Sequence, residues 1–244
     1  MYYISTNQIL IKKKLFTYQE ILVKRKTQSI MKHYRNSFYL PINKFDLSVF
    51  YYKCGLIFIP NPIVKNIENK DFIDGGAYIG DSALVFEKFY NPHKIYAFEP
   101  ELINYNQMLE TIEKNNLNKI IPIRKGLGEK DVSLKVIFQG SCSYISDTDG
   151  EEINITTIDK LVFDENLNVG LIHLDVEGFG LKTLKGAYRT IKKFKPILLI
   201  AIYHNGEEFF EIIQYIDELK INYKYIFRKL NPNNPYFETY LIAW

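Results

Sequence analysis

From Asp71 to the end of the chain, short apolar runs alternate with stretches in which apolar residues recur every three or four positions. The runs are typical of buried strands, and the longer spacing is typical of helices with one buried face. This alternation predicts a mainly parallel sheet covered by helices on both faces. Strands are predicted at 72–74, 94–98, 120–123, 171–175, 196–202, 223–230 and 238–243, and helices at 82–89, 102–112, 157–163, 181–192 and 209–219.

The last two predicted strands fix how the sheet ends. Only a short connection without a helical pattern, 231–236, separates them. A parallel pair would need a crossover of a dozen or more residues, so these two strands must be antiparallel. Between the third and fourth strands, the alternating residues Val132–Phe138 follow a Gly126-Leu127-Gly128 turn and predict one arm of an extra hairpin. The polar stretch 139–152 is expected to be a mobile loop beside the site.

The first 69 residues follow a different pattern. Apolar residues at steps of four, three and four predict a helix over 8–33, namely Ile11, Leu15, Tyr18 and Leu22. Proline and glycine residues between Tyr39 and Pro62 predict an extended, turn-rich segment. We therefore expect 1–69 to be an N-terminal extension that packs on a main domain over 70–244, since it is too small and polar for a core of its own.

Charge is spread unevenly along the chain. Residues 1–70 carry twelve Lys or Arg against three Asp or Glu, whereas the remainder is acidic and the whole chain has a net charge of +3. We favour a solvated helix face for this basic part, but contact with a membrane surface or another anionic surface stays open. No nucleic-acid-binding motif matches, so no nucleic-acid partner is predicted.

Composition narrows the class of protein further. The chain has 244 residues, 47% apolar and 24% charged, which is ordinary for a globular protein. Its longest apolar run, Pro196–Tyr203, is far short of the roughly 20 residues that a membrane-spanning helix needs. The N-terminus has no pattern of a secretion signal. Cys54 and Cys142 are too few for a disulfide framework or a zinc site, so a reducing cytoplasm is expected.

A glycine-rich turn follows the first predicted strand. The run Phe72–Ser82 reads Phe-Ile-Asp-Gly-Gly-Ala-Tyr-Ile-Gly-Asp-Ser, a strand that leads through Asp74 into a turn and then a helix start. Glycines at such a turn accept positive φ and let the backbone approach a ligand closely. The helix start beyond them favours negative charge. The Asp-x-Gly-x-x-x-Gly spacing differs from the Gly-x-Gly-x-x-Gly of dinucleotide-binding enzymes.

An acidic residue, Glu99, ends the second predicted strand 25 residues after Asp74. A carboxylate there is placed to accept hydrogen bonds from ribose hydroxyls, although it would also suit a capping or surface role. Tyr78 in the turn leaves little room for a pyrophosphate, and S-adenosylmethionine has none. We predict this cofactor, held by Asp74, Gly75, Gly76, Ala77, Tyr78, Gly80, Asp81, Glu99 and Asp175.

Three further side chains follow the fourth and fifth predicted strands. Asp175 and Glu177 come directly after one, and His204 follows the other. The carboxyl ends of parallel strands form the ligand crevice of such a sheet, so all three are candidate catalytic residues. The carboxylates are suited to orienting an acceptor hydroxyl, to binding the methionyl amino group or to holding a metal. No third ligand is evident, so no metal site is predicted. His204 is equally compatible with a structural role, and for His173, within its strand, we favour packing.

Together these motifs resemble the FkbM family of S-adenosylmethionine-dependent methyltransferases. The resemblance runs from Phe72 to His204 through Phe72–Ser82, Tyr96–Pro100, Thr157–Asp159, Leu174–Gly178, Leu184–Ala187 and Tyr203-His204, and Glu238–Leu241 fits the last strand. It implies an α/β fold, a seven-stranded Rossmann-like sheet of the class I type. It also implies O-methylation of sugars or natural products. Gly180 departs from the family, where an acid is often found, and His173 replaces a common Lys.

The function expected from the sequence is therefore methyl transfer from S-adenosylmethionine to a hydroxyl of a sugar or surface-polysaccharide precursor. Asp175 or His204 would take the hydroxyl proton. Two alternatives stay open. One is an NAD-dependent oxidoreductase on a similar sheet, and the other is a non-catalytic glycan- or membrane-associated module derived from a methyltransferase. The sequence does not predict the oligomeric state.

Overall fold

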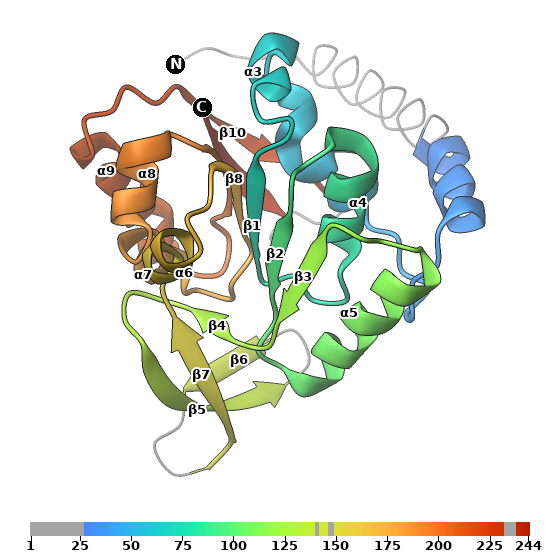
Figure 1. The fold of residues 1–244 in the computed structure, drawn as a ribbon, viewed down its shortest axis with the longest axis horizontal. Helices are drawn as coiled ribbons and strands as arrows, with labels where there is room; N and C mark the ends of the chain where they lie inside the picture. The colour runs from blue at the N-terminus through green and yellow to red at the C-terminus, as the bar shows by residue number, and fades with distance from the viewer. Residues whose placement is uncertain (1–26, 140–141, 146–148, 232–237) are drawn as a thin grey trace, which may run out of the picture.

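A computed structural model describes residues 27–139, 142–145, 149–231 and 238–244. Its centre is a seven-stranded sheet in the order β10-β11-β9-β8-β1-β2-β3 (Figure 1). The strands are β1 Asp71–Gly75, β2 Ile95–Phe98, β3 Ile120–Ile123, β8 Val169–Leu174, β9 Ile197–Ala201, β10 Tyr225–Lys229 and β11 Thr239–Ala243. β11 pairs antiparallel with both β9 and β10, and the pairs among the other strands are parallel. The predicted fold class, including the antiparallel last strand, is confirmed.

Helices cover both faces of this sheet. On one face lie α4 (Asp81–Tyr90) and α5 (Leu102–Lys114), whose buried residues pack with Phe72 of β1. The other face packs on helices α6 (Ile158–Asp164), α7 (Gly180–Lys185), α8 (Tyr188–Phe194) and α9 (Gly206–Glu218). Because side chains alternate along each strand, neighbouring residues such as Phe72 and Ile73 enter the two opposite cores.

The single helix predicted over 181–192 is two helices, α7 and α8. The chain breaks at Gly186, where an added Cβ would lie 2.0 Å from the carbonyl oxygen of Gly128. The Asp159 carboxylate accepts from the backbone N–H groups of Arg189 and Thr190 (2.9 and 2.7 Å) and so caps the start of α8. Thr157 caps α6 in the same way, through Lys160 N–H (3.0 Å). Two residues of the Thr157–Asp159 motif therefore organise helix starts.

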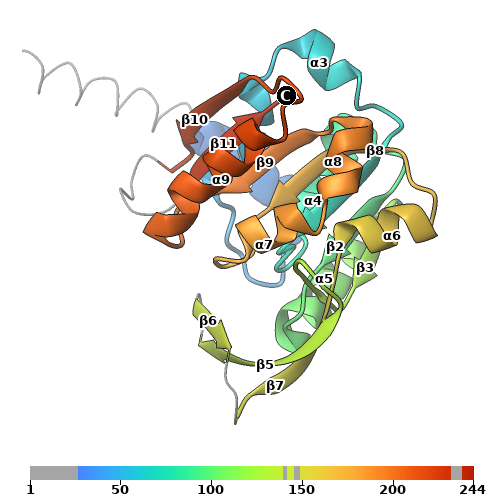
Figure 2. The same ribbon diagram turned by 90° about the vertical axis from the view of Figure 1, so that its left-hand side faces the viewer.

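A second, four-stranded sheet lies beyond the edge strand β3, in the order β4-β7-β5-β6 (Figure 2). Its strands are β4 Gly126–Leu127, β5 Val132–Gln139, β6 Cys142–Ile145 and β7 Glu151–Thr156. β5 pairs antiparallel with β6 and β7, which confirms the predicted extra hairpin arm. The prediction that 139–152 is only a loop is wrong, because β6 and the start of β7 fall inside it. Residues 140–141 and 146–148 lie outside the described part.

The N-terminal part differs from its prediction. Residues 27–37 are helical, and the rest of the predicted helix over 8–33 lies outside the described residues. Residues 38–46 lack helix and strand, but the remainder of the segment predicted as extended forms α2 (Leu47–Phe50), a 3₁₀ segment η1 (Lys53–Phe58) and the start of α3 (Asn61–Lys65). Pro60 and Pro62 start α3, because a fixed φ suits the first turn of a helix.

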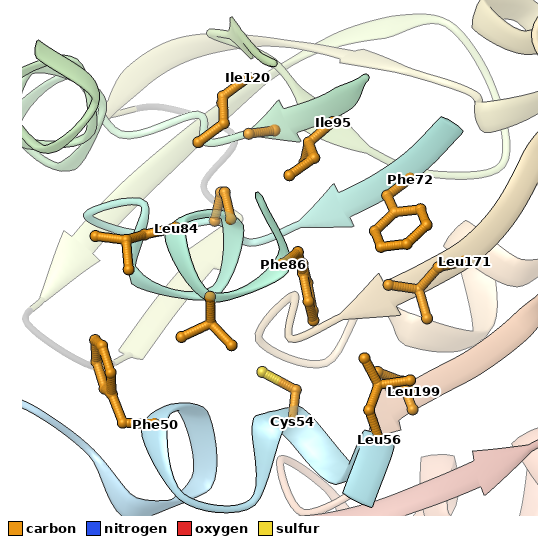
Figure 3. Packing of buried hydrophobic residues seen from close by; sticks show 14 of the residues in the cluster. Phe50, Cys54, Leu56, Phe72, Leu84, Phe86, Ile95, Ile120, Leu171 and Leu199 are labelled. Carbon is orange, nitrogen blue, oxygen red and sulfur yellow. The ribbon is translucent and has the colours of Figure 1, made fainter. Parts of the chain in front are cut away.

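Side chains from this N-terminal part enter the core beside the sheet. Phe50, Cys54 and Leu56 lie against α4 and the strands, in one buried cluster with Phe72 and Phe86 (Figure 3). The cluster also takes in Leu171 and Leu199 of the central strands. Residues 27–69 thus complete one face of the main sheet. In the described part of the chain, none of the helices has the length and apolar character needed to cross a membrane.

Candidate functional site

The glycine-rich turn joins the carboxyl end of β1 to the start of α4. Gly76 and Gly80 have φ angles of 76° and 80°, a region that other residues rarely adopt. A Cβ on Gly76 would lie 1.9 Å from the carbonyl oxygen of Asp175, so the loop after β8 rests directly on the turn. Asp175 N–H also donates to the Gly75 carbonyl (2.9 Å). The turn and the loop that carries Asp175 therefore form one backbone unit.

Several N–H groups of this turn are bonded within the protein. Gly76 and Ala77 donate to the carbonyl of Phe98 (3.0 and 2.9 Å), and Tyr78 donates to Glu99 Oε2 (2.9 Å). The turn is thus tied to the carboxyl end of β2. The Tyr78 side chain is 38% exposed and projects from the turn to the outside.

Glu99 lies directly after β2, across from the turn. Its side chain is buried, and its second oxygen accepts from Glu101 N–H (2.9 Å). Burial raises the pKa of Glu99 to about 7, against the hydrogen bonds from Glu101 and Tyr78 that lower it. The acid predicted at the end of the second strand therefore stands beside the glycine turn.

The two aspartates of the turn occupy different places. Asp74 is fully buried, and its carboxylate accepts from Ser82 Oγ (2.6 Å) and contacts His173 Nδ1 (2.7 Å). Asp81 starts α4, where its carboxylate accepts from Ser82 N–H (3.0 Å). Burial, together with the charge of Asp46 from the N-terminal part, raises the pKa of Asp81 to about 7. Asp81 thus lies at the start of α4 beside the turn, whereas Asp74 is enclosed in the interior.

The three candidate catalytic residues come together at the carboxyl edge of the sheet. His204 Nε2 lies 3.2 Å from Asp175 Oδ1 and 3.6 Å from Glu177 Oε2. Glu177 has a φ of 47°, so the chain after β8 turns sharply to place its side chain there. Asp175 also accepts from the hydroxyls of Tyr203 (3.2 Å) and Tyr240 (3.1 Å).

These contacts determine the protonation states of Asp175 and His204. Burial alone would raise the pKa of Asp175, but His204, His173 and Tyr240 outweigh it and hold that pKa below its usual value. Burial alone would lower the pKa of His204, but Asp175 and Glu177 outweigh it and raise that pKa. Asp175 is therefore the anion of the pair, and its charge favours the protonated form of His204, the group of the pair that changes its protonation state.

Sequence reasoning missed three contributors to this site. Tyr203 directly precedes His204 and shares its motif, which is the signal in the sequence that could have found it. Tyr240 arrives through the pairing of β11 with β9, opposite Ala201, and this register is not readable from sequence. Glu208 of α9 fills the space beside Gly180, where an added Cβ would lie 2.9 Å from its Oε1. That oxygen accepts from Leu181 N–H (3.0 Å), so a carboxylate from α9 caps α7.

No group of three or more His, Cys, Asp or Glu side chains suited to hold a metal occurs within the described residues. The charged side chains around the site are mainly carboxylates, and one cation, Lys44, lies near Tyr78, Asp81 and Glu238. Burial and the neighbouring Asp175 raise the pKa of Glu238, just before β11, to about 7. Asp175, Glu177 and Glu208 make the surroundings of His204 acidic.

Comparison with known proteins gives a family match and several similar folds. Residues 74–225 match the family described as "Methyltransferase FkbM domain". The chain is 25% identical over 192 residues to a tRNA(Phe) (4-demethylwyosine(37)-C(7)) aminocarboxypropyltransferase of Methanocaldococcus jannaschii, covering 72% of this chain and 74% of that protein.

Two solved structures share the fold. A methyltransferase FkbM from Methylobacillus flagellatus superposes with a TM-score of 0.60 at 20% identity, over 90% of this chain. The match spans only 59% of that protein's chain. Aeropyrum pernix fibrillarin, solved with S-adenosyl-L-methionine, superposes with a TM-score of 0.50 at 14% identity, over 80% of this chain and 74% of its own.

Proposed function

The chain belongs to the FkbM family of methyltransferases, and from that premise we propose that it moves a methyl group from S-adenosylmethionine to a hydroxyl of a sugar or surface-polysaccharide precursor. The observation that carries the proposal is the Asp175–His204 pair, held at 3.2 Å beside the glycine turn. The proposal needs a cofactor site on one side of that pair and an acceptor site on the other.

The residues around the turn fit the cofactor. Gly76 has no room for a Cβ, and the buried Glu99 carboxylate stands beside the turn at the end of β2, suited to ribose hydroxyls. Tyr78, Asp81 and Asp175 would border the methionyl part, whose amino group is a cation that carboxylates favour. When bound, S-adenosylmethionine supplies a methyl group that is already electrophilic. Alignment of donor and acceptor is then the protein's main contribution, worth roughly 7–11 kcal/mol.

We assign the proton-accepting role to His204. A sugar hydroxyl holds its proton tightly at neutral pH, so a base helps as the new O–C bond forms. Asp175 is a weak base, because its lowered pKa and two tyrosine donors stabilise the anion. It is suited to orienting His204, which receives the hydroxyl proton and later releases it to water. Glu177, 3.6 Å from the same ring nitrogen, adds to the field that stabilises the charged ring.

The charge of the crevice favours a neutral or cationic acceptor. Asp175 and Glu177, on the loop after β8, lie next to His204, and Glu238, just before β11, neighbours Asp175. Asp81 at the glycine turn adds a further carboxylate, beside Lys44. Binding a phosphate chain requires Lys or Arg side chains that neutralise it. A neutral or amino-bearing sugar, with Tyr78 as a stacking face, suits this crevice better than a phosphorylated one.

A second candidate function comes from the Methanocaldococcus relative, which acts on tRNA. An aminocarboxypropyl transfer would use the same cofactor and would leave methylthioadenosine in place of S-adenosylhomocysteine. Its acceptor is a polyanion, and the acidic crevice speaks against it.

The full-length protein should be incubated with cofactor labelled either in the methyl group or in the carboxyl group, and with three acceptor pools: neutral glycans, nucleotide-linked sugars and tRNA. We expect methyl label in the neutral glycans, together with S-adenosylhomocysteine. Carboxyl label in tRNA, or an absence of both by-products, would refute the proposal.

A further inference from the structure

A line of polar side chains runs beneath the crevice, from the helix after the glycine turn to Asp175. Ser82 Oγ donates to Asp74 Oδ2 (2.6 Å), and Asp74 Oδ1 lies 2.7 Å from His173 Nδ1. On the other side of the ring, His173 Nε2 lies 3.5 Å from the hydroxyl oxygen of Tyr240. The Tyr240 hydroxyl donates to Asp175 Oδ2 (3.1 Å). Five side chains from four elements and one loop thus connect the two halves of the site.

The middle of this line is closed to solvent. Asp74, His173 and Tyr240 are exposed by 0%, 3% and 2%, and the β1–β8 register sets Asp74 directly opposite His173. The His173 and Tyr240 rings stack with centroids 5.9 Å apart and an angle of 3°. Buried polar groups that are fully hydrogen-bonded hold a single arrangement, because any alternative leaves one of them unpaired.

Each hydrogen bond along this line pairs one donor with one acceptor. A carboxylate only accepts, so His173 Nδ1 carries a proton and donates to Asp74. Burial works against a charged ring, but Cys54 and Asp74 raise the pKa of His173 well above its ordinary value. The Tyr240 hydroxyl gives its hydrogen to Asp175, so its oxygen lone pairs are left to face His173 Nε2.

We propose that Tyr240, itself held by His173 and Asp74, is a positioning residue for Asp175 and, through Asp175, for His204. This proposal rests on the proposed function, in which His204 accepts the hydroxyl proton. The Tyr240 hydroxyl takes up one lone pair of Asp175 and limits how strongly that carboxylate holds the proton of His204. The strand that leads into the cofactor turn thereby fixes the geometry and proton affinity of the base.

Other ionisable groups also face the pair and must stay constant in a test. Asp175 is near Tyr203, His173 and Glu238, and His204 is near Glu177 and Glu208. Cys54 of η1 faces His173. A useful variant therefore removes one hydroxyl and no charge. Tyr240→Phe does so and keeps the ring that stacks on His173.

The first measurement needs no activity: an NMR titration of the His204 ring in the full chain, for the parent protein and Tyr240→Phe. Asp175, with one donor fewer, binds the imidazolium more tightly, so the titration of His204 should move to higher pH. Tyr203→Phe, which removes the other hydroxyl donor, should move it in the same direction. Tyr223→Phe is the matched control, since its buried hydroxyl donates to the Pro196 carbonyl at the other edge of the sheet (2.6 Å).

The second measurement is the pH profile of methyl transfer. Tyr240→Phe should lower turnover roughly tenfold, as expected for one hydrogen bond to a charged group, with affinity for S-adenosylhomocysteine unchanged. The acid limb of the profile should move to higher pH with the titration. A His204 titration that stays in place in a folded Tyr240→Phe would overturn the positioning role. If the parent protein transfers no methyl group, the proposed function is refuted. The NMR titration of His204 would still test the positioning role of Tyr240.

Discussion

The two halves of the crevice are built in different ways. On the cofactor side, Glu99 is held by backbone N–H groups, those of Tyr78 and Glu101. On the acceptor side, Asp175 is held by side chains that arrive from β11 and the end of β9. The first arrangement is made by the backbone and tolerates little change in it, whereas the second depends on side chains brought together by strand pairing. We expect backbone changes to damage the cofactor half and side-chain changes to damage the acceptor half.

Gly76→Ala should have the largest effect. A Cβ there meets the Asp175 carbonyl at 1.9 Å and forces a positive φ on alanine, so the free energy of unfolding should fall by about 2–5 kcal/mol. Thermal melting and calorimetry with S-adenosylhomocysteine measure both consequences. Gly206→Ala, where a Cβ would meet nothing within 4 Å, is the control and should change neither. Normal stability of Gly76→Ala would contradict the close backbone contact.

Glu99→Gln should weaken cofactor binding by roughly 10–100-fold, because a hydrogen bond to a charged acceptor becomes one to a neutral amide. The pKa of Glu99 is about 7, so the difference from the parent protein should shrink as the pH falls below that value and Glu99 becomes neutral. Calorimetry at pH 6 and pH 8 checks this. Glu113→Gln, on the exposed side of α5, serves as the control. Equal affinity of Glu99→Gln and parent protein at pH 8 would remove Glu99 from the site.

Asp175→Asn tests the acceptor half, in which Asp175 raises the pKa of His204. It removes the anion that raises the pKa of His204, so the acid limb of the pH–rate profile should move to lower pH, and lost orientation should lower the maximal rate roughly tenfold. Steady-state kinetics across pH measure both. A limb that stays in place would mean that the titrating group is not His204.

Asp81→Asn should have the smallest effect, and its stability in the absence of cofactor isolates the titration of Asp81 from any contact with the methionyl part. The folded-state pKa of about 7 lies above the ordinary 3.8, so the native state holds this proton more tightly and the stabilisation is lost as the pH rises from about 4 through 7. The amide should therefore increase the free energy of unfolding at pH 8 by on the order of 1 kcal/mol and change it little at pH 4. Urea unfolding at pH 4 and pH 8 measures this difference in the free energy of unfolding. If Asp81→Asn is stabilised equally at both pH values, titration of Asp81 is not the cause.

The same contrast explains what the sequence predicts. The sheet, its antiparallel end and the glycine turn follow from local patterns, and Glu99 follows from its place at a strand end. Asp175, Glu177 and His204 are found because parallel strands share a carboxyl edge. Tyr240 cannot be found in this way, because the pairing register of β11 with β9 decides on which face of the sheet its side chain lies. The short helices after Leu47 were also missed, because their turns depend on packing of Phe50 and Leu56 into the core rather than on periodicity.

The most direct test of this account compares His204→Ala with His93→Ala, whose partly exposed ring pairs with Asp71 at the start of β1. Single-turnover methyl transfer and affinity for S-adenosylhomocysteine should be measured on the same samples. We predict that His204→Ala loses about 10²–10⁴-fold in rate and keeps its affinity, while His93→Ala changes neither. An unchanged rate in His204→Ala, or a loss of affinity that matches the loss of rate, would contradict the separation of a cofactor half from an acceptor half.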